Sequence, residues 1–126
     1  MRSGSALRAS VVAGPLLLAG QAAAQKLDIA GPYGNESGCA YEAGQVGEGD
    51  ERFVLRPDGL EAYAGICEFV QVLPARSGAS VVTGLCESEG QLAVRMFAIS
   101  RPDPENDSLL VFFADGGLWH EVRPCE

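Results

Sequence analysis

The chain is poor in the residues from which common catalytic and metal sites are built. It has one histidine, and its four cysteines include no C-x-x-C pair. This pattern disfavours both a zinc site and a thioredoxin-like redox centre. A G-x-S-x-G motif, which would indicate a nucleophilic serine, is also missing from the sequence. The composition therefore predicts a protein that is not an enzyme and that carries no cofactor and no metal.

Long hydrophobic runs are also missing. The longest near the start, Val11–Ala19, is shorter than the roughly 20 residues that span a bilayer. Two arginines precede it, and Ala22–Ala24 follows it with the small residues that a signal peptidase recognises. We therefore predict that residues 1–24 are a signal peptide, cleaved before Gln25. No cysteine lies at the cleavage point to carry a lipid anchor, so we expect a periplasmic or secreted protein without a membrane anchor.

Positive charge is scarce. Nine Lys and Arg face 17 Asp and Glu, and because two of the nine leave with the signal peptide, the formal charge changes from −8 to −10. Such a surface repels nucleic acid and anionic lipid. An unknown protein or a basic ligand would suit it better. Acidity also keeps exported proteins soluble, so the charge alone does not identify a partner.

Four cysteines remain in the predicted mature chain: Cys39, Cys67, Cys86 and Cys125. In an exported domain of this size they are expected to form two disulfides, for which three pairings exist.

One pairing is favoured by the strand pattern. Leu60–Leu73 and Ser80–Ser88 resemble two strands joined by a turn at 74–79. A hairpin centred on this turn places residues opposite each other when their numbers sum to 153, as those of Cys67 and Cys86 do. The other two cysteines would then join the start of the domain to its end. A change of one residue in the turn would alter the register, so the other pairings stay open.

Residues 25–126 are expected to form one folding unit. Within it, 25–51 is rich in glycine and lacks a sustained period, which predicts an irregular lead-in with at most one short strand, near Ile29–Tyr33. From 52 to 126, short strand-like segments recur at intervals of about ten residues, with turn signals such as Glu89-Gly90 between them. The pattern predicts an all-β fold, a single small antiparallel meander of six or seven strands closed into a partial barrel or a sandwich.

Three groups of side chains are candidate sites. Asp103, Glu105 and Asp107 alternate as Ca²⁺ ligands can, but the glycine and the final carboxylate of an EF-hand loop are missing, which favours a solvated loop. The acidic clusters 48–51 and 87–89 lie beside glycine-rich turns, where burial is not expected to tune them for catalysis. His120 is expected to be a structural strand residue, because in a strand its neighbours point to the opposite face.

Aromatic and aliphatic side chains alternate along the strand-like segments. Tyr63 and Phe69 share the strand face of Cys67, which makes them either core residues or part of an exposed aromatic patch; we favour the core. In the segment 91–100, one face carries Leu92, Val94 and Met96, and the other carries Arg95 and Phe97.

Several short motifs resemble those of a group of small exported alphaproteobacterial proteins without an assigned activity. The motifs are Gly31-Pro32-Tyr33-Gly34, Leu60-Glu61-Ala62-Tyr63, Leu85-Cys86-Glu87-Ser88-Glu89-Gly90 and Arg123-Pro124-Cys125. The resemblance implies a four-cysteine β-domain in the periplasm and no functional residues. In general build the chain is also similar to periplasmic lysozyme inhibitors, although Ser77-Gly78-Ala79-Ser80-Val81 lacks the tyrosine of their Ser-Gly-x-x-Tyr loop.

The function expected from the sequence is therefore that of a non-catalytic binding or interaction module. An inhibitor of a cell-wall hydrolase such as lysozyme is the first alternative, because an acidic protein attracts a basic enzyme. An enzyme that uses the carboxylates of the acidic clusters is the second.

Overall fold

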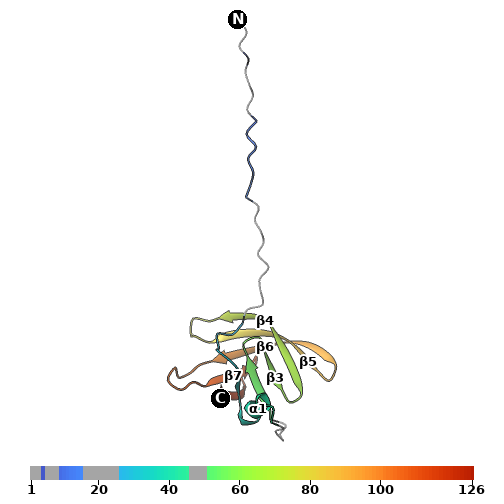
Figure 1. The fold of residues 1–126 in the computed structure, drawn as a ribbon, viewed down its shortest axis with the longest axis vertical. Helices are drawn as coiled ribbons and strands as arrows, with labels where there is room; N and C mark the ends of the chain where they lie inside the picture. The colour runs from blue at the N-terminus through green and yellow to red at the C-terminus, as the bar shows by residue number, and fades with distance from the viewer. Residues whose placement is uncertain (1–3, 5–8, 16–25, 46–50) are drawn as a thin grey trace.

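The chain forms a closed antiparallel barrel in which each strand pairs with its neighbours in sequence (Figure 1). The computed structural model describes residues 4, 9–15, 26–45 and 51–126. The strands are β1 (Tyr33–Gly34), β2 (Phe53–Arg56), β3 (Gly59–Ala62), β4 (Gly65–Pro74), β5 (Ser80–Ser88), β6 (Gln91–Ser100), β7 (Leu109–Phe113) and β8 (Leu118–Pro124). The helix α1 (Glu36–Glu42) lies between β1 and β2. The predicted all-β antiparallel fold is confirmed.

The expected strand count of six or seven is slightly too low, because the described residues form eight strands. One extra strand comes from Leu60–Leu73, which is two strands rather than one. The chain turns at Tyr63-Ala64, and β3 then pairs with β4 through contacts such as Ala62 opposite Gly65. The other is β1, which has only two residues and overlaps the short strand expected near Ile29–Tyr33 at Tyr33 alone.

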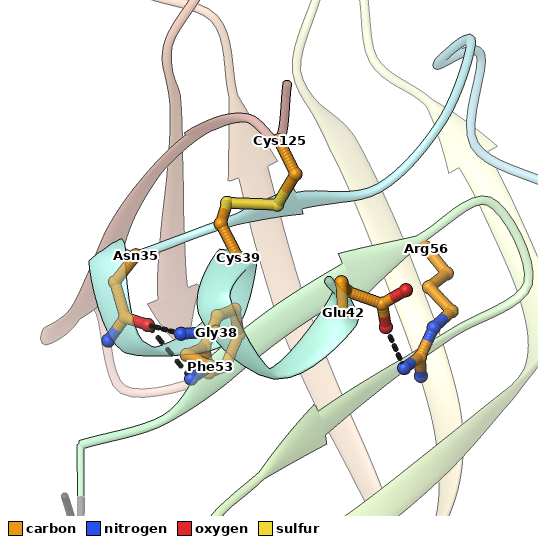
Figure 2. The surroundings of a disulfide bond; sticks show 7 residues. All are labelled: Asn35, Gly38, Cys39, Glu42, Phe53, Arg56 and Cys125. Carbon is orange, nitrogen blue, oxygen red and sulfur yellow. Dashed lines mark hydrogen bonds and ion pairs between the residues drawn. A yellow bond between two sulfur atoms is a disulfide. The ribbon is translucent and has the colours of Figure 1, made fainter. Parts of the chain in front are cut away.

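The glycine-rich segment 25–51 is more ordered than expected, since its described part contains both β1 and α1. The side-chain oxygen of Asn35 caps α1 by accepting hydrogen bonds from the backbone N–H of Gly38 at 2.8 Å and of Phe53 at 3.1 Å (Figure 2). Gly38 lets the helix approach β2 closely, because a Cβ there would lie 2.0 Å from the carbonyl oxygen of Phe53. A helix of seven residues is about two turns long, too short to show a period in the sequence.

Ion pairs and an aromatic contact hold α1 against the strands. The guanidinium of Arg56 pairs with the carboxylate of Glu42 on the helix (Figure 2) and lies 3.3 Å from that of Glu61 on β3. The guanidinium carbon of Arg52 lies 4.0 Å from the ring centroid of Tyr41. These side chains are only partly buried, so each contact contributes modestly to stability.

Both favoured disulfides are present. Cys67 and Cys86 face each other across β4 and β5, with their Cα atoms 4.0 Å apart. Cys39 on α1 is bonded to Cys125 beyond the end of β8, which brings the helix and the C-terminus together (Figures 1 and 2). The second bond spans the seam where Tyr33 of β1 pairs with Pro124 of β8.

The predicted hairpin register is correct around the disulfide and shifts beyond it. Residues whose numbers sum to 153 are opposite each other from Ile66 to Phe69. An irregularity at Val70 then moves the register by one, so that Gln71 is opposite Thr83. Such a β-bulge inserts one residue into a strand and increases its local twist, which helps a sheet curl into a barrel.

The barrel interior is filled by aromatic and branched side chains. The fully buried large ones are Phe53, Phe69, Phe97, Leu55, Leu60, Val82, Val111 and Val122. Val54 is also fully buried, but it alternates with Phe53 and Leu55 and so lies on the other face of β2. Phe69 is therefore core, as expected, together with Cys67. Tyr63 is not core, because it lies in the turn between β3 and β4 and is exposed.

In the described part of the chain, no helix has the length and apolar character needed to span a membrane.

Candidate functional site

An apolar pocket opens at one end of the barrel. Its volume is about 200 Å³. The wall is formed by residues from β3 to β8: Leu60, Ala62, Ala64, Gly65, Ile66, Cys67, Cys86, Glu87, Ser88, Arg95, Phe97, Phe113 and Trp119. We call this hollow the mouth pocket. Eight-stranded barrels have interiors just wide enough for side chains or one small ligand, so a hollow of this size is in keeping with the fold.

Three aromatic rings form one side of the mouth pocket. The ring of Trp119 is stacked on that of Phe113 at a centroid distance of 4.7 Å and on that of Phe97 at 5.6 Å. Phe53 meets the indole edge-on from the core, at 4.9 Å. Trp119 is thus fixed between the core and the pocket, and its ring is half-buried.

Arg95 stands at the rim of the mouth pocket. It alternates with Met96 and therefore shares the inner face of β6 with Phe97, which is core. Its partner on β5 is Gly84, where a Cβ would be in ordinary contact, at 3.4–3.5 Å, with Phe97 and the Cys67–Cys86 disulfide. Arg95 is exposed, and it makes no ion pair with any residue that the structure describes. Glu87 also lines the pocket, but it alternates with the buried Cys86 and so directs its side chain outward.

Among the described residues, nothing pairs with the first part of β6 on the side of β7, which leaves a free strand edge. Gln91–Met96 pairs with β5, whereas pairing with β7 begins only at Phe97. A hollow of about 500 Å³ runs along this edge, between Val94–Phe97 and the residues Phe113–Asp115 where β7 ends. It shares Arg95, Phe97 and Phe113 with the mouth pocket, so the two hollows are neighbours.

The outer face beside this edge is apolar. Leu92 is 68% exposed, Val94 71% and Met96 50%. Across the sheet, Leu85 of β5 lies opposite Val94 and is also exposed. The two faces of β6 are therefore those expected from the sequence, but the aliphatic face points to solvent and the face carrying Arg95 points inward.

The Asp103, Glu105 and Asp107 loop shows no metal-site geometry. Asp107 accepts a hydrogen bond of 2.6 Å from the hydroxyl of Tyr33, and Asp103 accepts one of 2.9 Å from the backbone N–H of Glu105. Burial and the Asp107 contact raise the pKa of Tyr33. Nowhere in the described chain do three His, Cys, Asp or Glu side chains come together in a way that could hold a metal ion.

The structure describes only part of the acidic clusters. Residues 48–50 lie outside the described part of the chain, and Glu51 and Glu89 are both exposed. Glu89 and Gly90 have φ values of 51° and 77°. This confirms the predicted two-residue turn, of the type that favours glycine.

His120 is held among aromatic rings on β8. Its ring centroid lies 4.5 Å from that of Phe53 and 5.9 Å from that of Trp119. Burial lowers the pKa of His120 below its ordinary value of 6.5, and the nearby Glu51 carboxylate opposes this shift. Among the described residues no side chain makes a hydrogen bond to the imidazole.

The lowered pKa of His120 makes stability depend on pH in a defined direction. Below pH ~6.5 the unfolded chain takes up a proton that the folded ring resists, so stability is expected to fall as pH decreases through this value and to level off below the folded pKa. Urea unfolding at several pH values between about 7.5 and about 5.5 measures the effect. The variant His120→Gln should flatten this part of the curve. An unchanged slope would assign the pH dependence to other groups.

Comparisons with protein-family models, with curated proteins and with solved structures gave no match. The mouth pocket and the free edge are thus described from this chain alone.

Sequence reasoning did not find these two features. The signal available was the aliphatic run of Leu92, Val94 and Met96 opposite a face that carries a charge. An alternation of this kind does not show which face of the strand points into the barrel. The free edge was not predictable either, because it arises from the pairing of β7 with only the second half of β6 in the closed barrel.

Proposed function

We propose that this chain is an exported, non-catalytic interaction module that binds a partner protein by adding a strand of that protein to the free edge of β6. The observation that carries the proposal is the unpaired edge Gln91–Met96 beside three exposed aliphatic side chains. A strand edge presents N–H and C=O groups that another chain can pair with, and natural proteins usually protect such edges with charge, proline or a covering loop.

The partner segment is expected to be extended, apolar at alternate positions and basic. Its apolar side chains would cover Leu92, Val94 and Met96. Glu68 and Glu87 border this surface, each opposite an outward aliphatic residue of the neighbouring strand, namely Leu85 and Leu92. Together with the net charge of −8, they favour Lys or Arg in the partner.

The proposed setting is the periplasm or the cell exterior. Two disulfides fit an oxidising compartment, because thiols stay reduced in the cytosol. The predicted signal peptide, 1–24, and the resemblance to small alphaproteobacterial exported proteins support the same setting. Much of 1–24 lies outside the described residues.

Selection of displayed random peptides on the purified protein tests this function. The selected peptides should alternate apolar residues with Lys or Arg. The variant Val94→Lys should bind them at least about tenfold more weakly, because it places charge in the apolar contact. The control Leu73→Lys makes the same kind of change at the other end of the outer face, where Leu73 lies opposite Val81, and should leave binding unchanged within about twofold.

Three results would count against strand addition. The first is that no peptides are enriched. The second is that Val94→Lys and Leu73→Lys weaken peptide binding equally. The third is that the backbone amides of Gln91–Met96 show no added protection from hydrogen exchange when a selected peptide binds. A basic cell-wall hydrolase is one class of partner that meets the stated requirements. Inhibition of lysozyme that Val94→Lys abolishes, and Leu73→Lys preserves, would identify it.

A further inference from the structure

We infer that the mouth pocket binds a small aromatic carboxylate, with its ring against Trp119 and its carboxylate on Arg95. This inference concerns the inner face of the barrel end and does not rest on the proposed partner binding at the outer face. Its basis is the combination of one apolar hollow, one stacked aromatic wall and one cationic rim residue.

The size of the pocket limits the ligand to a compact molecule. An apolar cavity of about 150 Å³ in another protein is large enough to hold benzene. The mouth pocket, at about 200 Å³, therefore has room for one six-membered ring with a short substituent. Larger drug-sized ligands normally occupy about 300–1,000 Å³, and they would not be enclosed here.

The wall selects for an apolar, flat group. Leu60 and the Cys67–Cys86 disulfide form one part of the lining, and the stacked rings of Phe97, Phe113 and Trp119 form another. Aromatic rings favour offset-stacked or edge-on neighbours, so a ligand ring gains more from this wall than an aliphatic chain of equal area. Trp119 is held by Phe53 from behind and needs no rearrangement to receive it.

The rim selects for an anion. Arg95 lies on the inner face of β6, on the same side as the wall residue Phe97, and opposite the buried Gly84, which is packed against Phe97 and the Cys67–Cys86 disulfide. A guanidinium presents paired N–H donors that match the two oxygens of a carboxylate. Among the described residues that line the pocket, Arg95 is the one cation, and Glu87 directs its charge to the other face of the sheet. An amine in this pocket would be repelled by Arg95.

The sequence provides a reporter for the test, because Trp119 is the only tryptophan in the chain. Its emission is followed while 3-phenylpropionate is added to the full-length protein, and the titration is repeated with the neutral 3-phenylpropanamide. We expect the carboxylate to bind with a Kd of roughly 0.1–1 mM and about tenfold or more tightly than the amide. Backbone amide shifts measured by NMR should change at the pocket residues and not at α1.

Three variants locate the site. Arg95→Gln should remove the preference for the carboxylate and leave amide binding unchanged within about twofold. Ala64→Phe, at an exposed position of the rim, should weaken both probes by filling the opening. Arg123→Gln removes an exposed arginine of β8 that does not line the mouth pocket, and it should change neither affinity.

Near-ultraviolet circular dichroism establishes that each variant is folded. Equal affinity for carboxylate and amide in the wild-type protein would overturn the role of Arg95, and so would an unchanged preference in Arg95→Gln. No change in Trp119 emission or in the amide shifts with either probe would overturn the pocket as a ligand site.

Discussion

Replacing Cys39 and Cys125 together by serine is expected to lower the free energy of unfolding by about 4–5 kcal/mol. The two cysteines are 86 residues apart, so their bond removes a large loop-closure entropy from the unfolded chain. The bond also spans the seam, where β1 contributes only two residues to the pairing of the first and last strands. A domain of this size has a total stability of about 5–15 kcal/mol, so the variant is expected to be marginal. Urea unfolding followed by circular dichroism measures the loss.

The second disulfide is the matched control. Cys67 and Cys86 are 19 residues apart, and the same entropy argument gives about 3 kcal/mol for their removal. The pair lies within a long hairpin that is also held by β4–β5 pairing. The double variant Cys67→Ser, Cys86→Ser should therefore lose less unfolding free energy than the variant without the Cys39–Cys125 bond. An equal or larger loss would contradict the explanation based on loop length.

The second large effect is expected from Phe53→Ala, at about 3–5 kcal/mol. Phe53 is 0% exposed and contacts the rings of both Trp119 and His120, so its loss leaves a cavity that rigid strands cannot close. The emission of Trp119 should shift to the red because the indole loses its edge-on neighbour.

The control for Phe53→Ala is Phe113→Ala. Phe113 also stacks on Trp119 but is 37% exposed, so its removal is expected to cost about 1 kcal/mol. Equal losses from the two variants would show that stability follows the aromatic stack rather than burial. Temperature and urea unfolding should rank the variants in the same order.

The hairpins were the most predictable part of the fold, because their signals are local. The alternation of residues in β4 and β5 and the turn between them placed Cys67 opposite Cys86, and the structure confirms both that register and the resulting pairing of the other two cysteines. The shift at Val70 was not predictable, since a bulge inserts one residue without changing the composition around it.

Of the elements that depend on distant contacts, β1 was expected only as a short strand near Ile29–Tyr33, and α1 was missed. β1 is a strand because Tyr33 pairs with both Leu55 and Pro124, and two residues show no period of their own. α1 is stabilised by the Asn35 cap and by the close approach of Gly38 to β2 rather than by an apolar stripe. β1 thus depends on closure of the barrel, and α1 depends on packing against β2.

Gly59 shows the same difference between a local sequence signal and a contact with a distant segment. Gly59 follows Pro57-Asp58 at a turn, where a positive φ is the usual reason for glycine. Its φ is not positive; instead, a Cβ there would lie 2.5 Å from the carbonyl oxygen of Cys67 on β4. The position of the glycine was informative, but its reason lies in the approach of the neighbouring strand. The mouth pocket escaped prediction on the same grounds, because strands far apart in sequence bring Leu60, Arg95 and Trp119 together.

Closure of the barrel between β1 and β8 has a consequence for the order of folding. Along the chain from β2 to β8, each strand pairs with the next one, whereas the seam joins β1 and β8, which are about as far apart in sequence as the domain allows. Contacts of high sequence separation form late, because the loop entropy must be lost before they are gained. The meander is therefore expected to assemble first and the seam last, so that Cys39 and Cys125 meet only in a nearly native chain and their bond reports that folding is complete.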